Sequence, residues 1–323
     1  MQLTTIPAPD FDLEKTLDSG QVFHWQKIDS GFVGTIGNQA VHVEQRGEML
    51  RATVASASSR CLEKHGQDTH ATVARYFALD HPLAQICASL PNDPAMNAAR
   101  DFCRGLRIIR QPKWECLATF ICSSMKQVAH IRQISRALRE RFGRTRRIDN
   151  YVVQTFPSAR RIAETTEKAL RECGLGYRAK NLLATARRVA TGDVDLERFA
   201  AMSDVDLRAK LCELPGVGAK VANCVMLFAY ERLRAFPIDV WIERVLREKY
   251  FPRARKLNAA RLHAFTQEYF GEHGGYAQQY LFHHARMSTR LRPATARQEC
   301  KRKIQRKRKS REGVLAHLSR HRG

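Results

Sequence analysis

The sequence has few acidic residues for its size and no long apolar run. It carries 32 Asp and Glu against 55 Lys and Arg, a formal net charge of +23 over 323 residues. No apolar stretch could cross a bilayer, so we expect no membrane partner. The N-terminus lacks the basic start and apolar stretch of a secretory signal. The surplus of positive charge predicts a polyanionic partner, and nucleic acid is the default. The alternative is a basic protein whose charge serves only its solubility.

Paired cysteines are also missing. The nine cysteines are scattered, and no two of them form a C-x-x-C pair. Such pairs are usual in zinc sites and iron–sulfur clusters, so the sequence indicates neither. Most of the cysteines lie in apolar helical patterns, which predicts buried thiols in a reducing cytoplasm. No internal repeat of the length found in solenoid proteins is visible.

The periodicity of the chain changes twice, which predicts three parts. Residues 1–93 are predicted to form an antiparallel α+β domain, because four short alternating segments between 21 and 55 indicate a meander of four strands. Residues 94–290 show helical periodicity and predict a helical core. Residues 291–323 are dense in Lys and Arg and predict a flexible basic tail. That tail is either a solvated, self-repelling end or a segment that attracts phosphates or serves in targeting.

A helical hairpin is predicted at about 205–230, where the sequence reads "DLRAKLCELPGVGAKVANCVMLFA". Pro215 stops the first helix. Gly216 and Gly218 are expected to allow positive φ and to leave backbone N–H groups uncovered. Such N–H groups at a helix N-terminus bind anions, and a DNA phosphate fits there without any reading of sequence. This L-P-G-V-G pattern is typical of the helix–hairpin–helix motif, the alternative being a plain helical hairpin.

Lys220 and Asp239 stand out beside this hairpin. Lys220 opens an apolar helix, where the positive end of the helix dipole disfavours a cation and so favours a neutral amine. A neutral lysine amine is a nucleophile and the usual former of Schiff bases. Asp239 follows Pro237 in "PIDVW" and could be an ordinary helix N-cap. A surface lysine that pairs with phosphate is the alternative for Lys220.

Six motifs, in order, carry a resemblance that covers residues 10 to 290. They are "SGQVFHW", "FICSS", "GLGYRAKNLLATAR", "LPGVGAKVANC", "PIDVW" and "YAQQYLF". They resemble the 8-oxoguanine DNA glycosylase/AP lyase branch of the helix–hairpin–helix (HhH-GPD) superfamily of base-excision DNA glycosylases. The resemblance implies a TBP-like antiparallel sheet domain followed by a mainly helical HhH-GPD core, an α+β fold. No cysteine cluster follows Asp239, unlike in the iron–sulfur branches.

The resemblance also implies an activity and two catalytic residues. The expected enzyme is a bifunctional DNA N-glycosylase with AP lyase activity that excises 8-oxoguanine from duplex DNA in base excision repair. Lys220 would attack the sugar C1′, expel the flipped base and hold the sugar as a Schiff base. Asp239 would stabilise positive charge on the sugar and help to orient the amine.

The resemblance assigns four residues to the base pocket. Gly20 would accept, through its carbonyl, the N7–H that 8-oxoguanine has and guanine lacks. Gln278 would bond the Watson–Crick face of the flipped base. Phe282 would stack on one face of that base and Cys224 would lie against the other. Core packing is the alternative for Phe282 and Cys224.

Further residues are expected to contact DNA, and some of them depart from the family pattern. Tyr177 would wedge beside the opposite base and Arg178 would bond it. The family has asparagines after "CSS" and an arginine five positions past the first, where this chain has "MKQ" and His130. Met125 can still fill a gap, but His130 offers no bidentate fork, so weaker reading of cytosine is expected. Trp241 replaces a frequent histidine.

No organic cofactor and no metal ligand set is expected, apart from a possible structural cation on carbonyls of the Gly216–Gly218 hairpin. The expected partner is duplex DNA containing 8-oxoguanine, and the expected state is a monomer. The protein would be cytoplasmic and nucleoid-associated in a bacterium, or nuclear in a eukaryote. Two alternative functions stay open. One is a monofunctional alkylbase glycosylase of the same superfamily, which does not need Lys220. The other is a non-catalytic DNA-binding protein.

Overall fold

The computed structural model describes residues 3–55, 62–254 and 256–291. The predicted basic tail lies outside the described residues from 292 onward, as do Cys61 and Cys300. Of the described cysteines, Cys212 is exposed and Cys87 half-buried. The others are buried, as the helical patterns predict: Cys103, Cys116, Cys122, Cys173 and Cys224.

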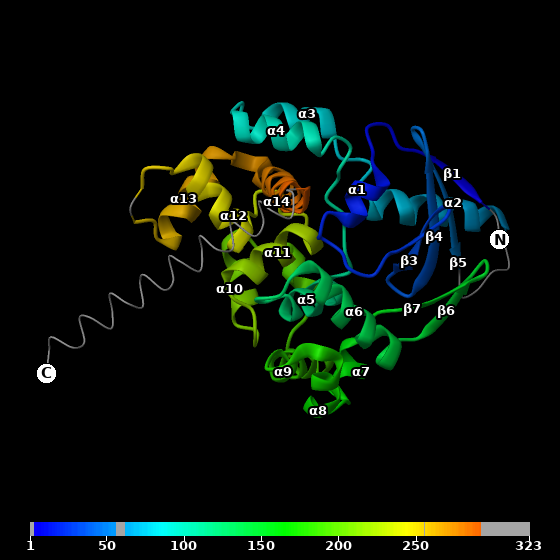
Figure 1. Cartoon of the computed structure of the whole chain (residues 1–323). Coiled ribbons are helices and arrows are strands. Elements are labelled where there is room, and N and C mark those ends of the chain that lie inside the picture. Colours follow the sequence, from blue (N-terminus) through cyan, green and yellow to red (C-terminus); the bar gives the residue numbers. More distant parts are fainter. Residues whose placement is uncertain (1–2, 56–61, 255, 292–323) are drawn as a thin grey trace, which may run out of the picture.

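A five-stranded antiparallel sheet forms the N-terminal layer, on the right in Figure 1. The strand order is β1-β5-β4-β3-β2. The strands are β1 (Thr4–Pro7), β2 (Gln26–Ile28), β3 (Gly31–Ile36), β4 (Gln39–Arg46) and β5 (Met49–Ala55). The predicted meander of four strands is confirmed in β2 to β5. The short edge strand β1 was not predicted, and it pairs with β5 in a register that places Ile6 opposite Leu50.

The sheet buries one face against helices α1 (Leu13–Asp18) and α2 (Leu62–Tyr76). The alternation of apolar residues sends Val41, Val43 and Leu50 into this small core. Phe77 and Ile109 close it from the chain segments that lead into the helical part. The segment between α1 and β2 contains the S-G-Q sequence. This segment runs beside the helical core.

The second layer is helical and holds the larger core (Figure 1). Its helices before the predicted hairpin are α3 (Leu83–Ser89), α4 (Pro94–Phe102), α5 (Lys113–Cys122), α6 (Val128–Phe142), α7 (Ala159–Ala163), α8 (Glu167–Leu170), η1 (Arg171–Leu175), α9 (Arg178–Ala190) and η2 (Arg198–Ala201). The two helices of the hairpin and the helices after it are α10 (Asp204–Cys212), α11 (Ala219–Ala229), α12 (Val240–Val245), η3 (Leu246–Tyr250), α13 (Ala259–Tyr269), η4 (Gly271–His273) and α14 (Gly274–Leu291). The α+β fold class predicted from the sequence is confirmed.

A β-hairpin inside the helical part was not predicted. Strands β6 (Thr145–Ile148) and β7 (Tyr151–Gln154) form a separate two-stranded sheet. Figure 1 shows this hairpin reaching back from the helices to the N-terminal sheet, where β6 contacts β4 and β5 while β7 contacts β3. Ile148 and Val153 pack there against Val33 and Ala40 in a small core of their own. The hairpin thus joins the two layers.

Helix α11 is the centre of the helical layer. Its residues from Val221 to Phe228 are all buried, because the helix is apolar on every side. It packs against α5 and α10, and the rings of Phe120 and Phe228 stack with centroids 5.4 Å apart. Helix α14 approaches closely at Gly275, where an added Cβ would lie 2.2 Å from Leu227 Cδ1. The N-terminal end of α11 reaches the surface, with Ala219 exposed and Lys220 half-buried.

In the part of the chain that the structure describes, no helix combines the length and apolarity needed to cross a membrane.

Candidate active site

Lys220 lies half-buried in the first turn of α11. Its Nζ donates to Ser123 Oγ at 3.1 Å and stands 5.2 Å from the centroid of the Phe120 ring. The Ser123 hydroxyl itself donates to Phe120 O at 2.7 Å, so its oxygen can only accept from the lysine. The amine is therefore held by Ser123, and the Cys224 side chain lies within its reach.

Asp239 caps the N-terminus of α12. Its Oδ1 accepts from Trp241 N at 3.0 Å and from Ile242 N at 2.9 Å. Burial raises the pKa of this carboxyl, while the Ile242 N–H and the nearby charge of Lys220 oppose that rise. The structure thus brings Lys220 and Asp239 within electrostatic reach of each other, with the carboxylate fixed by backbone donors. An amine and an anchored carboxylate so placed suit attack on a sugar carbon that becomes positive.

Cys224 lies one turn after Lys220 and is 4% exposed. Burial raises the pKa of its thiol to about 11, and the charge of Lys220 opposes the shift. The group therefore stays a neutral thiol at physiological pH and does not compete with the lysine as a nucleophile. It offers a small, soft surface beside the amine.

Gly20 and Phe282 come together from opposite ends of the chain. Gly20 has φ +88°, and an added Cβ would lie 3.0 Å from Phe282 Cε1 and 3.3 Å from Arg286 Nη1. Both the backbone angle and the close approach favour glycine. Arg286 is 5% exposed, donates to the Asp18 carbonyl, and lies over the Phe282 ring at 5.8 Å. Neither Arg286 nor this packing was expected from the sequence.

Two glutamines that were not predicted fix the Gly20 segment. Gln21 is fully buried, and its Nε2 donates to Arg107 O at 2.8 Å while its Oε1 accepts from Ile109 N at 2.9 Å. Gln279 Nε2 donates to Ser19 O at 3.0 Å, which ties α14 to the same segment. Gln21 belongs to the S-G-Q motif and Gln279 to the Q-Q pair of the sequence. Their hydrogen-bond partners are so distant in the chain that periodicity does not reveal them.

Gln278 is 5% exposed on α14, one turn before Phe282. Its Oε1 finds no hydrogen-bond donor among the described residues. A buried amide oxygen without a partner is costly unless a ligand supplies the donor. Its position one turn from Phe282 therefore fits the predicted role at the edge of a flipped base, although that role stays a prediction.

Most of the remaining residues predicted to contact DNA are exposed or half-buried. Met125 is 94% exposed with φ +54°, and Tyr177 is 57% exposed. His130 lies exposed in the first turn of α6, and Trp241 is half-buried with the Arg244 guanidinium 5.6 Å from its ring. Arranged in this way, these side chains can contact DNA, and their individual roles stay predictions.

Arg178 lies in a different environment from the one expected. It is 5% exposed, its Nε donates to Ser124 O at 2.8 Å, and its Nη2 donates to the same carbonyl. Its Nη1 donates to Leu175 O at 3.3 Å, and its guanidinium stacks 4.3 Å from the Tyr177 ring. Carbonyls of the protein therefore occupy the fork that was expected to bond a base.

The hairpin between α10 and α11 follows the prediction in part. Gly216 has φ +84°, and an added Cβ would lie 2.8 Å from Asn181 Cβ, so only glycine fits. Gly218 has φ −98°, so the expectation of positive φ there was wrong. Val217 N donates to Leu214 O at 3.0 Å, which leaves the amides from Gly218 onward as the candidate phosphate donors.

Among residues 3–55, 62–254 and 256–291, no three His, Cys, Asp or Glu side chains group as metal ligands. The predicted cation at Gly216–Gly218 would rest on carbonyls instead and stays a prediction.

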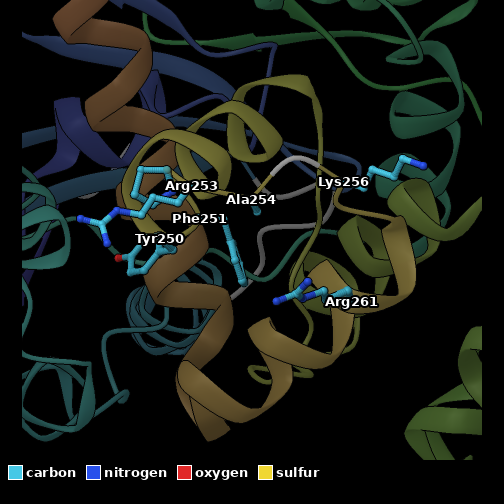
Figure 2. Close-up of a pocket in the computed structure, with 7 residues that line it drawn as sticks. Tyr250, Phe251, Arg253, Ala254, Lys256 and Arg261 are labelled. Atoms are coloured by element: carbon cyan, nitrogen blue, oxygen red, sulfur yellow. The ribbon is translucent and has the colours of Figure 1, made fainter.

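A hollow of about 600 Å³ lies elsewhere, between η3 and the start of α13. In Figure 2 Phe251 stands between Tyr250 and Arg253 on one side and Arg261 on the other, and Lys256 points away. None of the predicted site residues lines this hollow. This hollow is therefore separate from the site that the side-chain geometry defines.

Comparisons with known proteins identify the family of the chain. Residues 4–117 match the family model of the 8-oxoguanine DNA glycosylase N-terminal domain. Residues 118–268 match that of the HhH-GPD superfamily base excision DNA repair proteins. The two matches adjoin and together cover the sheet layer and most of the helical layer.

Individual relatives extend over most of the chain. A probable N-glycosylase/DNA lyase of Methanothermobacter thermautotrophicus is 30% identical over 90% of this chain and 99% of its own. The N-glycosylase/DNA lyase OGG1 of Arabidopsis thaliana is 30% identical over 84% of this chain and 77% of its own. The Clostridium acetobutylicum 8-oxoguanine glycosylase/lyase, solved with DNA containing cytosine opposite 8-oxoguanine, has a TM-score of 0.78 at 30% identity, covering 86% of this chain and 93% of that one. The chain therefore belongs to the 8-oxoguanine DNA glycosylase/AP lyase family of the HhH-GPD superfamily, and it is a DNA N-glycosylase with DNA lyase activity in base excision repair.

Proposed function

We propose that this protein excises 8-oxoguanine from duplex DNA, using Lys220 as the nucleophile and a Schiff-base intermediate. The observation that carries the proposal is that Lys220, whose amine donates to Ser123, lies near enough to Asp239 for its charge to act on that carboxyl, which two backbone amides anchor. The family membership and the 8-oxoguanine glycosylase/lyase relatives support the substrate class.

In the proposed reaction, the lone pair of the Lys220 amine attacks C1′ of the damaged nucleoside. The glycosidic bond breaks, and the base leaves with the electron pair of that bond and takes up a proton. The attacking nitrogen loses a proton, and opening of the sugar ring gives the Schiff base. The Asp239 carboxylate stabilises the positive charge that develops on the sugar. Loss of the proton at C2′ then expels the 3′ phosphate, which is the lyase step.

The base must leave the duplex before this attack, and the proposed pocket lies between α11, α14 and the Gly20 segment. Gln278 and Phe282 meet the base from α14, while Cys224 lies on the other side beside the amine. The Gly20 carbonyl accepts the N7–H of 8-oxoguanine. A buried acceptor of this kind rejects guanine, which would leave it without a donor.

The proposed duplex contacts surround that pocket. Met125 and Tyr177 fill the space that the flipped nucleotide leaves, and His130 lies near the opposite base. The hairpin amides from Gly218 onward bind the phosphate backbone, with Trp241 close to the damaged strand. No partner chain is required by this arrangement, so we propose that the protein acts as a monomer.

Single-turnover base release tests the proposal. Two duplexes should be compared that differ only in 8-oxoguanine or guanine opposite cytosine, each with and without borohydride. We expect release and a reduced covalent complex with 8-oxoguanine, and neither with guanine. Release without any trapped complex would refute the Schiff base, and equal release of guanine would refute the pocket.

A further inference from the structure

A tight turn joins α5 to α6 and holds two residues of the proposed site. Lys126 N donates to Ser123 O at 3.1 Å, which closes a four-residue turn. Its third residue, Met125, has φ +54°. A positive φ is uncommon outside glycine and is kept only where the surroundings hold it. Something in the structure must therefore stabilise this turn against relaxation.

The Arg178 guanidinium is placed to do so. Its Nε and Nη2 both donate to Ser124 O, the carbonyl of the central peptide of the turn. The orientation of that peptide decides whether the third residue has positive or negative φ. A third donor, Nη1, donates to Leu175 O at 3.3 Å and ties the arginine to the end of η1. The buried fork therefore selects the strained form of the turn.

The same turn reaches the catalytic amine. Ser123 is its first residue, and its hydroxyl accepts from Lys220 Nζ. Met125, two residues later, is almost fully exposed. The contact of Arg178 with Ser124 O thus bears on two features: the hydrogen bond between Ser123 and the amine, and the direction of the Met125 side chain.

We propose that Arg178 is a positioning residue that clamps the Ser123–Lys126 turn and so couples the opposite-strand side of the site to the Lys220 amine. This inference rests on the proposed function for its reaction readout. It replaces the expected base contact of Arg178 with a contact to the protein backbone. A displacement of Met125 by DNA then acts on Ser124 and, through Ser123, on the orientation of the amine.

The first test compares Arg178→Lys with the matched control Arg187→Lys, an exposed arginine on the same helix. Lysine keeps the charge but cannot form the fork. Single-turnover release is measured with 8-oxoguanine opposite cytosine and opposite an abasic analogue. We expect Arg178→Lys to be about tenfold to a hundredfold slower on both duplexes, and the control to be unchanged. A loss confined to the cytosine duplex would mean that Arg178 reads the base and would overturn the clamp.

A double-mutant cycle adds a readout that a general loss of stability would not give. In Met125→Gly the turn adopts positive φ without strain, so Arg178→Lys should cost much less in that background. Equal losses in both backgrounds would contradict the clamp.

A third measurement needs no substrate. Hydrogen exchange of the Lys126 amide in DNA-free protein should be faster in Arg178→Lys than in Arg187→Lys. If exchange changes while 8-oxoguanine is not released by the wild type, the proposed function fails and the clamp stands. If exchange is unchanged, the clamp fails and the proposed function is unaffected.

Discussion

The base-pocket side and the opposite-strand side of the candidate site differ in how far they are built before DNA arrives. Gln278 and Cys224 are 5% and 4% exposed, and hydrogen bonds from Gln21 and Gln279 fix the Gly20 segment beside them. Met125 and Tyr177, in contrast, are 94% and 57% exposed. The pocket side is held by the protein, whereas the other side presents free surface.

This contrast indicates where each function resides. A prearranged pocket with an anchored amine and carboxylate suits chemistry, because no reorganisation is needed at the moment of reaction. Exposed side chains suit contact with the opposite strand, because DNA can reach them. Changes on the pocket side should therefore affect the chemical step strongly, and changes on the exposed side should affect selectivity or binding more mildly.

The largest expected effect is that of Lys220→Gln. It should reduce base release and borohydride trapping to background while duplex binding stays nearly unchanged, because the nucleophile is lost and the phosphate contacts remain. Binding by a fluorescence titration and trapping by gel shift check the two halves. Residual trapping in this variant would identify another amine as the nucleophile.

Asp239→Asn should slow release by about 10²- to 10⁴-fold. Burial raises the pKa of the Asp239 carboxyl, so the folded protein favours the protonated form more than the unfolded chain does. Its contribution to stability is therefore greatest in acid and is lost as pH rises through that raised pKa. The neutral asparagine, which can still cap α12, should raise the melting temperature at pH 7 and leave it nearly unchanged in acid.

The same raised pKa sets the pH dependence of the wild type. Activity should fall on the acid side at a higher pH than an ordinary aspartate would give. A pH profile of single-turnover release and a melting curve at two pH values check both expectations. A lower melting temperature for Asp239→Asn at pH 7 would mean that the ionised carboxylate stabilises the fold.

A smaller effect is expected on the exposed side. With Met125 and His130 in place of asparagine and arginine, discrimination for cytosine opposite 8-oxoguanine should be weak. His130→Arg should restore a fork and increase that discrimination by about tenfold to a hundredfold, since one bidentate base contact is worth about 1–3 kcal/mol. Release rates opposite each of the four bases measure it. A wild type that already prefers cytosine far more strongly than this would show that another residue reads the base.

The smallest effect should come from removing residues 297–323. Binding to damaged and undamaged duplexes should weaken by the same factor, about tenfold at physiological salt, with a flatter salt dependence, because the tail contributes counterion release only. Titrations at several salt concentrations check this. A selective loss of binding to damaged duplex would contradict it.

The sequence predicted the parts of the fold that have a local pattern. The strands β2 to β5 and the α10–α11 hairpin follow from alternation, helical periodicity and the Pro-Gly turn. The β6–β7 hairpin was missed, although Asp149 and Asn150 give a turn signal between β-branched residues, because its strands are short and lie between long helical segments. Strand β1 was missed because it has only four residues and its pairing partner β5 lies more than 40 residues away in the chain.

The site was predictable where a residue type identifies its own chemistry, as with Lys220 and Asp239. It was not predictable where the role depends on distant partners. Gln21 and Gln279 bond backbone groups far away in the chain, and no periodicity reveals them. Arg178 shows the same limit, because its sequence position suggested a base contact while its fork binds Ser124 O. The φ of Gly218 likewise depends on how the turn closes.

Mapping the covalent complex tests the central claim most directly. Wild-type protein is reduced with borohydride on a duplex carrying 8-oxoguanine opposite cytosine, digested, and analysed by mass spectrometry for the sugar-modified peptide. The account predicts one modified residue, Lys220, in the peptide that contains "VGAKVANC". A modification on any other lysine or on the N-terminal amine, with Lys220 unmodified, would contradict it.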